Sequence, residues 1–322
     1  MALPVTMYRW DDPGAPQVVD GKPSEYMNVI KKCLVEGYGS KTSLGWALVD
    51  SGISPPFMAF QNDIASGHSG GTLLLSSQDD NNWSSNVRVQ SCLEYVSKNT
   101  KSKAGAFFEF NAGTSTPAYM STKWVLIGTS AAFYFFSFPG HKLAANYMSN
   151  SVVPCFFSGD INSFIENDQC RFVTMSGGLN VTATSYSYSF INPLSQGYDT
   201  SVGYIYNIDG SSEYKEFNIK TLLPQPIYSS STVNYDYSPE INFLSSAYCT
   251  IKTSSIVSDE NLNDSSSPFV RGVIPGLFYA YQPGYRNSGP VPFIKSFDGT
   301  DYFLVPHVGT YQSMCWISLG SW

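Results

Sequence analysis

Alternating apolar and polar positions dominate the chain and predict a mainly β protein. Runs rich in aromatic and β-branched residues, bounded by Asn, Asp, Ser and Gly, are typical of strands on a pleated, half-buried surface. Early runs of this kind are "PPFMAFQND", "GTLLLSSQDD" and "NVRVQSCLEYV" (residues 55–63, 71–80 and 86–96). We expect three successive strands here, with the polar residues between them forming turns.

Two further pairs of apolar runs predict hairpins. "KWVLIG" and "AAFYFFSF" (residues 123–128 and 131–138) are joined by Thr129 and Ser130, and their apolar character indicates burial on at least one face. Near the end of the chain, "VPFIKSF" and "YFLVPHV" flank the sequence Asp298-Gly299-Thr300. Asp-Gly suits the positive φ angles of a type I′ turn, so a hairpin is expected there as well.

One segment near the N-terminus has helical rather than β periodicity. Apolar residues recur on one face between about residues 24 and 36, which predicts an amphipathic helix. Ser24 is the expected N-cap, and Gly37 is expected to end the helix. The following "GYGSKTSLGW" predicts a tight, glycine-dependent turn that leads into a strand. The structural residues expected in this turn are Gly37, Gly39, Gly45 and Trp46.

These patterns together predict a mainly β fold of antiparallel sheets, sandwich-like, with one N-terminal amphipathic helix. A change of character near residue 185 suggests an N-terminal β-rich domain over 1–185 and a C-terminal β-rich domain over 186–322. No Pro-rich or Gly-rich linker marks this boundary, so one continuous unit is the alternative. The polar run at residues 258–267 is expected to be a loop.

Charge and hydropathy exclude two classes of partner. The net charge is −7, and the 18 basic residues are scattered, so we expect no nucleic-acid partner. The cluster of Lys98, Lys101 and Lys103 is interpreted as a solvated loop. The apolar runs are shorter than the roughly 20 residues that cross a bilayer, and no export signal is visible, so we expect no membrane contact.

Six cysteines are spread along the chain without ligand spacing. No Cys-x-x-Cys motif occurs and no histidine lies near a cysteine, so we expect no metal site. We expect reduced core residues, because a chain without an export signal is made in the cytosol. The cysteines are Cys33, Cys92, Cys155, Cys170, Cys249 and Cys315.

A Gly-x-Ser-x-Gly pattern at residues 67–71 raises the question of a serine hydrolase. In such enzymes the nucleophile lies on a sharp turn between a buried strand and a helix. Ser69 is instead preceded by polar residues and followed by a predicted strand, "GTLLLSS". We therefore interpret the glycines as part of a turn and expect no catalytic residue here.

The remaining acid and base candidates carry no specific pattern. Each of the three histidines, His68, His141 and His307, follows turn or strand residues. Asp11-Asp12 and Asp79-Asp80 lie beside turn residues, where Asp accepts local hydrogen bonds, and lack EF-hand spacing. A pair of glycosidase carboxylates could be drawn from several acids, as in almost any β protein. These acids are Glu94, Glu109, Asp160 and Glu166.

Tyrosines that alternate with small polar residues between Thr184 and Tyr206 are typical of an interface. This stretch contains no Lys, Arg or Glu, which interface cores also exclude. The alternative is a sheet whose second face covers the tyrosines within one subunit. The candidate interface residues are Tyr186, Tyr188, Tyr198, Tyr204 and Tyr206.

Six stretches, in their order along the chain, resemble those of a known family. A Gly-Tyr-Gly-Ser-Lys turn is followed by Gly-Trp and later by Phe-x-Gly-Asp-Ile. The stretches are "CLVEGYGSKTSLGW", "SGGTLLLSSQDD", "NVRVQSCLEYVS", "KWVLIGTSAAFYFF", "FFSGDINSF" and "VRGVIPGLFYAYQ". In these features the chain resembles a little-characterised family of tailed-bacteriophage virion structural proteins. It departs from the family in lacking an Arg-Val-Asp-Asp ending after "GTLLL", and residues 182–264 have no clear counterpart.

The resemblance implies a non-enzymatic structural component of a tailed-phage virion, present in many copies and mounted on the neck, collar or tail. A capsid decoration protein, or a receptor-binding or fibre-base protein, is the alternative within this class. The implied partners are other copies of the chain and other virion proteins, with no cofactor. The implied location is the virion, after synthesis in the host bacterial cytoplasm. An alternative of another class is a hydrolase that uses Ser69 or a carboxylate pair.

Overall fold

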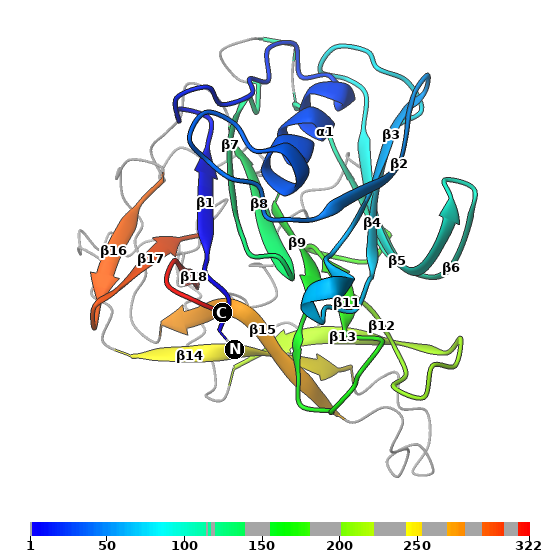
Figure 1. The fold of residues 1–322 in the computed structure, drawn as a ribbon, viewed down its shortest axis with the longest axis vertical. Coiled ribbons are helices and arrows are strands. Elements are labelled where there is room, and N and C mark those ends of the chain that lie inside the picture. The colour runs from blue at the N-terminus through cyan, green and yellow to red at the C-terminus, as the bar shows by residue number, and fades with distance from the viewer. Residues whose placement is uncertain are drawn as a thin grey trace, which may run out of the picture.

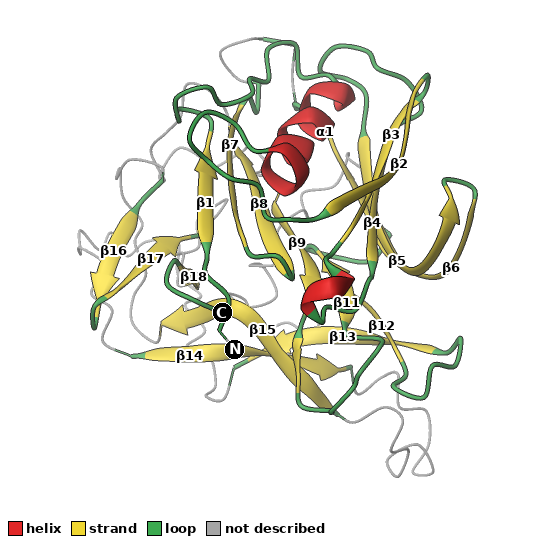
Figure 2. Cartoon of the chain, viewed as in Figure 1, coloured by secondary structure: helices red, strands yellow, loops and turns green. Residues whose placement is uncertain are grey.

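The computed structural model confirms a mainly β fold of antiparallel sheets with one helix near the N-terminus (Figures 1 and 2). The structure describes residues 2–113, 115–116, 120–138, 155–180, 201–221, 243–252, 269–280, 292–305 and 315–322. The strands within these ranges form three sheets. The expected polar loop at 258–267 and the expected domain boundary near 185 lie outside the described residues.

The first sheet is a meander in which each strand pairs with the next one in the chain. The three early strands predicted from the sequence are confirmed as its β3, β4 and β5. Their inward residues reach the core, as shown by Phe60, Leu75 and Val89, which are completely buried. The strands are β2 (Ala47–Ile53), β3 (Pro56–Gln61), β4 (Thr72–Ser76), β5 (Val87–Ser97) and β6 (Thr100–Phe110).

The second sheet contains the first predicted hairpin. Its central strands β7 and β8 pair in antiparallel register across Thr129 and Ser130, which confirms the hairpin. Every residue of β8 is buried, because this strand is covered on both faces. In order across the sheet, the strands are β1 (Thr6–Arg9), β7 (Lys123–Gly128), β8 (Ala132–Phe138), β9 (Cys155–Asp160) and β11 (Phe172–Met175).

The third sheet is built mostly from the C-terminal half of the chain. The predicted hairpin around Asp298 and Gly299 is confirmed, and both residues have positive φ, 48° and 75°. Its strands, in order, are β12 (Gly203–Tyr206), β13 (Tyr214–Lys220), β14 (Leu244–Ile251), β15 (Val270–Ala280), β18 (Cys315–Ser318), β17 (Thr300–Leu304) and β16 (Ile294–Phe297). The short β10 (Asn162–Ser163) also pairs with β15, so a segment from between strands of the second sheet joins the third.

The predicted helix is α1 (Pro23–Lys31), which continues as a π-helical turn over Lys32–Glu36 and ends at Gly37. The predicted N-cap at Ser24 is wrong, because Lys22 is the N-cap. Pro23 is the reason: it lacks an N–H and has a fixed φ, so it is favoured as the first helical residue. The backbone and hydroxyl of Ser24 instead donate hydrogen bonds to the two carboxylate oxygens of Asp80, at 2.9 and 2.7 Å.

Aromatic side chains form much of the core between the helix and the sheets. Tyr26 of α1 packs edge-on against Phe110 of β6, with ring centroids 5.3 Å apart, and Trp46 packs edge-on against Phe133 of β8 at 5.5 Å. One continuous hydrophobic cluster contains residues of all three sheets. Figure 1 shows α1 beside both β7–β8 and β2–β3, while β13–β15 cross below. All six cysteines are buried.

The two ends of the described chain lie side by side, as the N and C labels of Figure 1 show. The backbone N–H of Leu3 donates to the carbonyl of Trp322 at 2.9 Å, and the N–H of Trp322 donates to the carbonyl of Leu3 at 3.1 Å. The Trp322 ring packs edge-on against Tyr134 of β8 at 5.4 Å. The C-terminal residue therefore contributes directly to the contact between the second and third sheets.

The predicted glycine turn folds the chain back onto the end of the helix. Gly37, Gly39 and Gly45 have φ angles of 76°, 55° and 82°, which residues with a Cβ rarely adopt. The backbone N–H of Trp46 donates to the carbonyl of Leu34 at 3.0 Å, and the Trp46 side chain is buried. This turn therefore places the indole in the core directly after the helix.

Two of these glycines differ in the space around them, which gives a controlled test. A Cβ on Gly39 would lie 2.2 Å from the carbonyl oxygen of Pro13, whereas a Cβ on Gly45 would meet nothing within 4 Å. We expect Gly39→Ala to lower the free energy of unfolding by more than about 1 kcal/mol, and Gly45→Ala to lower it by less than Gly39→Ala does. Urea unfolding measures both; equal stabilities for the Gly39 variant and wild type would contradict the turn.

Candidate functional site

Ser69 lies in a loop whose geometry differs from that of a serine nucleophile. The chain leaves β3, forms a single 3-10 turn at Ile64–Ser66, and reaches Gly67 with a φ of 84°. It then enters β4 at Thr72. A strand follows Ser69 where a nucleophile turn requires a helix, in agreement with the order read from the sequence.

The Ser69 side chain is held by the carboxylate of Asp160, at the end of β9. The Ser69 hydroxyl donates to Oδ1 of Asp160, and the Ser69 backbone N–H donates to Oδ2 at 2.9 Å. Asp160 is only 5% exposed. A buried carboxylate is stable only when its oxygens are hydrogen-bonded or paired with a cation. The serine therefore serves Asp160 as a donor.

Two further side chains complete the set of Asp160 partners. Asn62 Nδ2 donates to Oδ1 at 2.9 Å, and Arg171 Nε donates to Oδ2 at 2.9 Å. The Asn62 carbonyl oxygen in turn accepts the backbone N–H of Gly70 at 2.8 Å, which fixes the loop. We call Asn62, Ser69, Asp160 and Arg171 the Asp160 cluster. It joins the first sheet to the second, because its members come from both.

A second buried ion pair joins the second sheet to the third. Arg271 of β15 is completely buried, and its Nε and Nη2 donate to the two oxygens of Asp168 at 2.6 and 2.7 Å. The Asp168 carboxylate also accepts from the Ser163 hydroxyl at 2.7 Å and from the Cys170 N–H at 2.9 Å. Burial raises the pKa of Asp168, but the hydrogen bonds and charge of Arg271, together with the hydrogen bonds from Ser163 and Cys170, lower it by more, so the net pKa is below its usual value. The pair therefore stabilises the fold at neutral pH and loses that contribution as the pH falls through this lowered pKa.

The described histidine does not form a catalytic triad with Ser69. His68 Nε2 lies 2.8 Å from the hydroxyl of Ser130, and burial lowers the pKa of His68. His141 and His307 lie outside the described residues. Thiol nucleophiles are also disfavoured, since burial raises the pKa of Cys92 to about 12, and a thiol must ionise to attack.

Three of the four candidate carboxylates are engaged in separate ion pairs. Glu94 pairs with Lys103 at 2.9 Å, Glu109 pairs with Arg88 at 2.7 Å, and Asp160 pairs with Arg171 at 2.9 Å. Glu166, the fourth, is an exposed residue of the connection after β10. Glycosidases require two carboxyl groups that face one substrate bond. Glu94, Glu109 and Asp160 instead contact three different cations.

The candidate interface tyrosines are divided by the described range. Tyr186, Tyr188 and Tyr198 lie outside it. Tyr204 is half-buried on β12, and its ring lies 4.4 Å from that of Tyr214. Tyr206 is 8% exposed, and its hydroxyl donates to the carbonyl of Ala104 at 2.9 Å, so this side chain packs within the subunit. An assembly interface over 184–206 stays a prediction.

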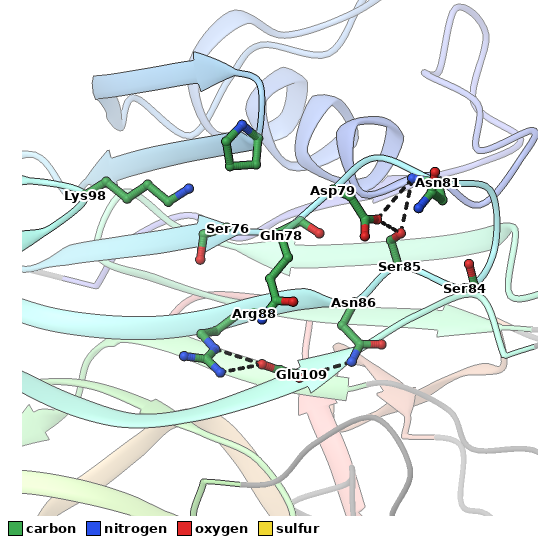
Figure 3. A pocket seen from close by; sticks show the side chains of 12 residues that line it. Ser76, Gln78, Asp79, Asn81, Ser84, Ser85, Asn86, Arg88, Lys98 and Glu109 are labelled. Carbon is green, nitrogen blue, oxygen red and sulfur yellow. Dashed lines mark hydrogen bonds and ion pairs between the residues drawn. The ribbon is translucent and has the colours of Figure 1, made fainter.

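The outer face of the first sheet carries a pocket of about 590 Å³ that sequence patterns did not predict. All but one of its lining residues are polar, and they come from separate turns and strands, as Figure 3 shows. Arg88, Glu109 and Asn86 form a connected network along one side of the pocket (Figure 3). The lining residues are Pro55, Ser76, Ser77, Gln78, Asp79, Asn81, Ser84, Ser85, Asn86, Arg88, Lys98 and Glu109.

Two other features are absent from the described part of the chain. No helix within it combines the length and the apolar character needed to cross a bilayer. No group of three or more His, Cys, Asp or Glu side chains in the same ranges could hold a metal ion.

The Asp160 cluster gives a direct stability prediction. We expect Asp160→Ala to lower the free energy of unfolding by about 3–5 kcal/mol, because it leaves Arg171 and Asn62 without their buried acceptor. Asp11→Ala is the matched control: Asp11 pairs with Arg9 at the surface and should cost less than about 1 kcal/mol. Urea unfolding distinguishes the two, and similar losses for both variants would show that the cluster is not a stabilising centre.

Known proteins add no constraint on these residues. No family model matches the chain, and no curated protein sequence matches it either. The proposal for its function therefore rests on the sequence stretches described above and on the arrangement of its own side chains.

Proposed function

We propose that this chain is a non-enzymatic structural component of a tailed-bacteriophage virion, present in many copies and mounted on the neck, collar or tail. One observation carries the proposal: residues of the stretches that resemble phage virion proteins contact one another where the sheets meet. Ser69 belongs to "SGGTLLLSSQDD", Asp160 to "FFSGDINSF" and Arg271 to "VRGVIPGLFYAYQ". Ser69 contacts Asp160, and the hydroxyl of Ser163, in the same stretch as Asp160, donates to the carbonyl of Arg271 at 3.3 Å.

The contacts of these residues support an architectural role. Ser69 and Asp160 hydrogen-bond each other, Asp160 also accepts from Arg171, and Arg271 donates from Nε and Nη2 to Asp168, all within the chain. The Gly37–Trp46 turn, part of another stretch of the resemblance, likewise places Trp46 in the core. A particle component requires a rigid frame that presents surfaces to neighbouring copies. Such a frame accounts for the resemblance without a shared active site.

The proposal includes the partners and the location. The partners are other copies of the chain and other virion proteins, with no nucleic acid, membrane or cofactor involved. The chain reaches the particle after synthesis in the host bacterial cytoplasm. A capsid decoration protein, or a receptor-binding or fibre-base protein, would require the same kind of rigid fold, since the fold does not determine the mounting point.

An averaged image of the intact particle tests the proposal. We expect density that fits this fold, repeated with the symmetry of a neck, collar or tail ring, and the chain should be present in purified particles by mass spectrometry. Repetition over the capsid faces would favour the decoration alternative. Absence of the chain from purified particles would contradict the proposal in all its forms.

Ester hydrolysis tests the alternative of another class. We expect no turnover of a p-nitrophenyl ester above background, and a reduction of only about 1–3 kcal/mol in unfolding free energy for Ser69→Ala, since one hydrogen bond to a carboxylate is lost. Ser66→Ala is the control, because Ser66 lies in the same loop and its hydroxyl bonds Asp63. Turnover by wild type that disappears in Ser69→Ala alone would establish the hydrolase.

A further inference from the structure

A row of residues, paired across three neighbouring strands, lines part of the polar pocket on the first sheet. Ser76 of β4 is paired with Arg88 of β5, and Arg88 with Glu109 of β6. Residues directly opposite one another in antiparallel strands share a face. Val87 and Val89, on either side of Arg88, are completely buried, so the row faces away from the core. Three strands therefore present polar side chains together at one outward position.

Turns on separate parts of the chain enclose this row. The β5–β6 turn contributes Lys98 and the β2–β3 turn contributes Pro55. The β4–β5 connection contributes Ser77, Gln78, Asp79, Asn81, Ser84, Ser85 and Asn86. The enclosed volume of about 590 Å³ lies within the range of about 300–1,000 Å³ usual for small-molecule sites. Figure 3 shows these side chains around a common space. The pocket is therefore large enough for a small organic ligand.

Part of the pocket is held in place before any ligand arrives. The Arg88 guanidinium lies over the Phe107 ring at 4.1 Å, and its Nε and Nη2 donate to Oε1 of Glu109 at 2.8 and 2.7 Å. Oε2 of Glu109 accepts from Asn86 at 3.0 Å, and Asn86 accepts from Asn111 at 2.9 Å. Fixed side chains lose little conformational entropy when a ligand binds.

Other polar groups of the lining are available to a ligand. The hydroxyls of Ser76 and Ser84, the amide of Gln78 and Nη1 of Arg88 have no hydrogen-bond partner among the described residues. The Lys98 ammonium lies over the Phe57 ring at 5.0 Å and forms no ion pair within the same described ranges. These groups include both donors and acceptors.

The charges around the pocket balance. Arg88 and Lys98 supply two positive charges, and Asp79 and Glu109 supply two negative charges. The hydrogen bond from the Ser85 hydroxyl lowers the pKa of Asp79, so Asp79 is ionised at neutral pH. A site for phosphate or another strong anion would carry an excess of positive charge, and a cation site would carry the reverse. The pocket therefore favours an uncharged ligand.

We propose that this pocket binds a neutral saccharide. Sugar hydroxyls both donate and accept hydrogen bonds, which matches the mixed free groups of Ser76, Gln78 and Arg88 around a space without net charge. The ligand is either a free sugar or a segment of a longer polysaccharide. This binding activity is independent of the place of the chain in a particle.

Saturation-transfer difference NMR on the whole chain tests the proposal. The probes are glucose, galactose, mannose and N-acetylglucosamine, together with maltohexaose, galactan, mannan and chitohexaose fragments, and inorganic phosphate as the charged control. We expect at least one neutral probe to bind, with affinity that changes less than about twofold between low and high NaCl concentration, because no charge is neutralised. Tighter binding of the longer probe indicates a polysaccharide segment, and equal binding indicates a free sugar.

Substitutions of two exposed glutamines locate the site. Gln78 lines the pocket, whereas Gln169 is an exposed residue of the turn before β11. We expect Gln78→Ala to weaken saccharide binding by about two- to tenfold and Gln78→Trp to abolish it by filling the space. Gln169→Ala and Gln169→Trp should bind like wild type, and melting curves establish that all four variants fold.

Three results would overturn the proposal. The first is that no neutral probe binds at about 10 mM, a concentration that would detect even weak sites. The second is that Gln78→Trp binds as tightly as Gln169→Trp, which would place the saccharide elsewhere. The third is that phosphate binds and displaces the sugar, which would make the pocket an anion site. None of these results bears on whether the chain is found in purified particles.

Discussion

The buried carboxylate of Asp160 imposes the constraint on which the arrangement of the sheets depends. A charge removed from water needs hydrogen bonds or an opposite charge, and those of Asp160 come from Asn62 and Ser69, before β4, and from Arg171, before β11. The first and second sheets must therefore approach in one orientation. Apolar packing alone specifies the relative orientation of two sheets less strictly, because many apolar arrangements bury a similar area.

The Asp168–Arg271 pair applies the same constraint to the third sheet. Arg271 of β15 is completely buried, so its positive charge requires a paired negative charge. The Asp168 carboxylate, within hydrogen-bond distance, supplies that charge. Between these two polar joints, aromatic side chains such as Phe110, Phe133 and Phe156 fill the interior. The aromatic core supplies most of the driving force for folding. The Asp160 cluster and the Asp168–Arg271 pair determine how the sheets are placed relative to one another.

The structural contacts lie in the interior of the protein, whereas the pocket lies on the outward face of the first sheet. The most hydrolase-like sequence pattern of the chain, around Ser69, is used inside the fold as a set of hydrogen-bond donors. The polar groups that remain available to a ligand lie instead beside Arg88 and Glu109, on residues that form no ligand-binding sequence motif. The structural contacts of this loop thus lie between the first and second sheets, and the proposed ligand-binding groups lie on the outward face of the first sheet.

Local patterns in the sequence were sufficient to predict the elements themselves. The strands around Phe60, Leu75 and Val89, the two hairpins, and the helix that ends at Gly37 are all present. Each depends on residues a few positions apart, through side-chain alternation, helical periodicity or turn chemistry. The N-cap was the exception, because the preference of Pro23 for the first helical position outweighed that of Ser24 for the cap.

The way in which those elements meet depends on contacts between residues far apart in the sequence. Arg271 and Asp168 are 103 residues apart in the sequence, and Ser69 and Asp160 are 91 residues apart. No local preference of either residue specifies such a partner, since the contact exists only once the sheets are packed. The pocket also depends on long-range contacts. Ser76, Arg88 and Glu109 become neighbours through strand register, which is set by pairing and burial across the whole sheet. Local sequence patterns thus specify the β elements, the helix and the turn glycines, whereas long-range pairing sets the contacts between the sheets and the composition of the pocket.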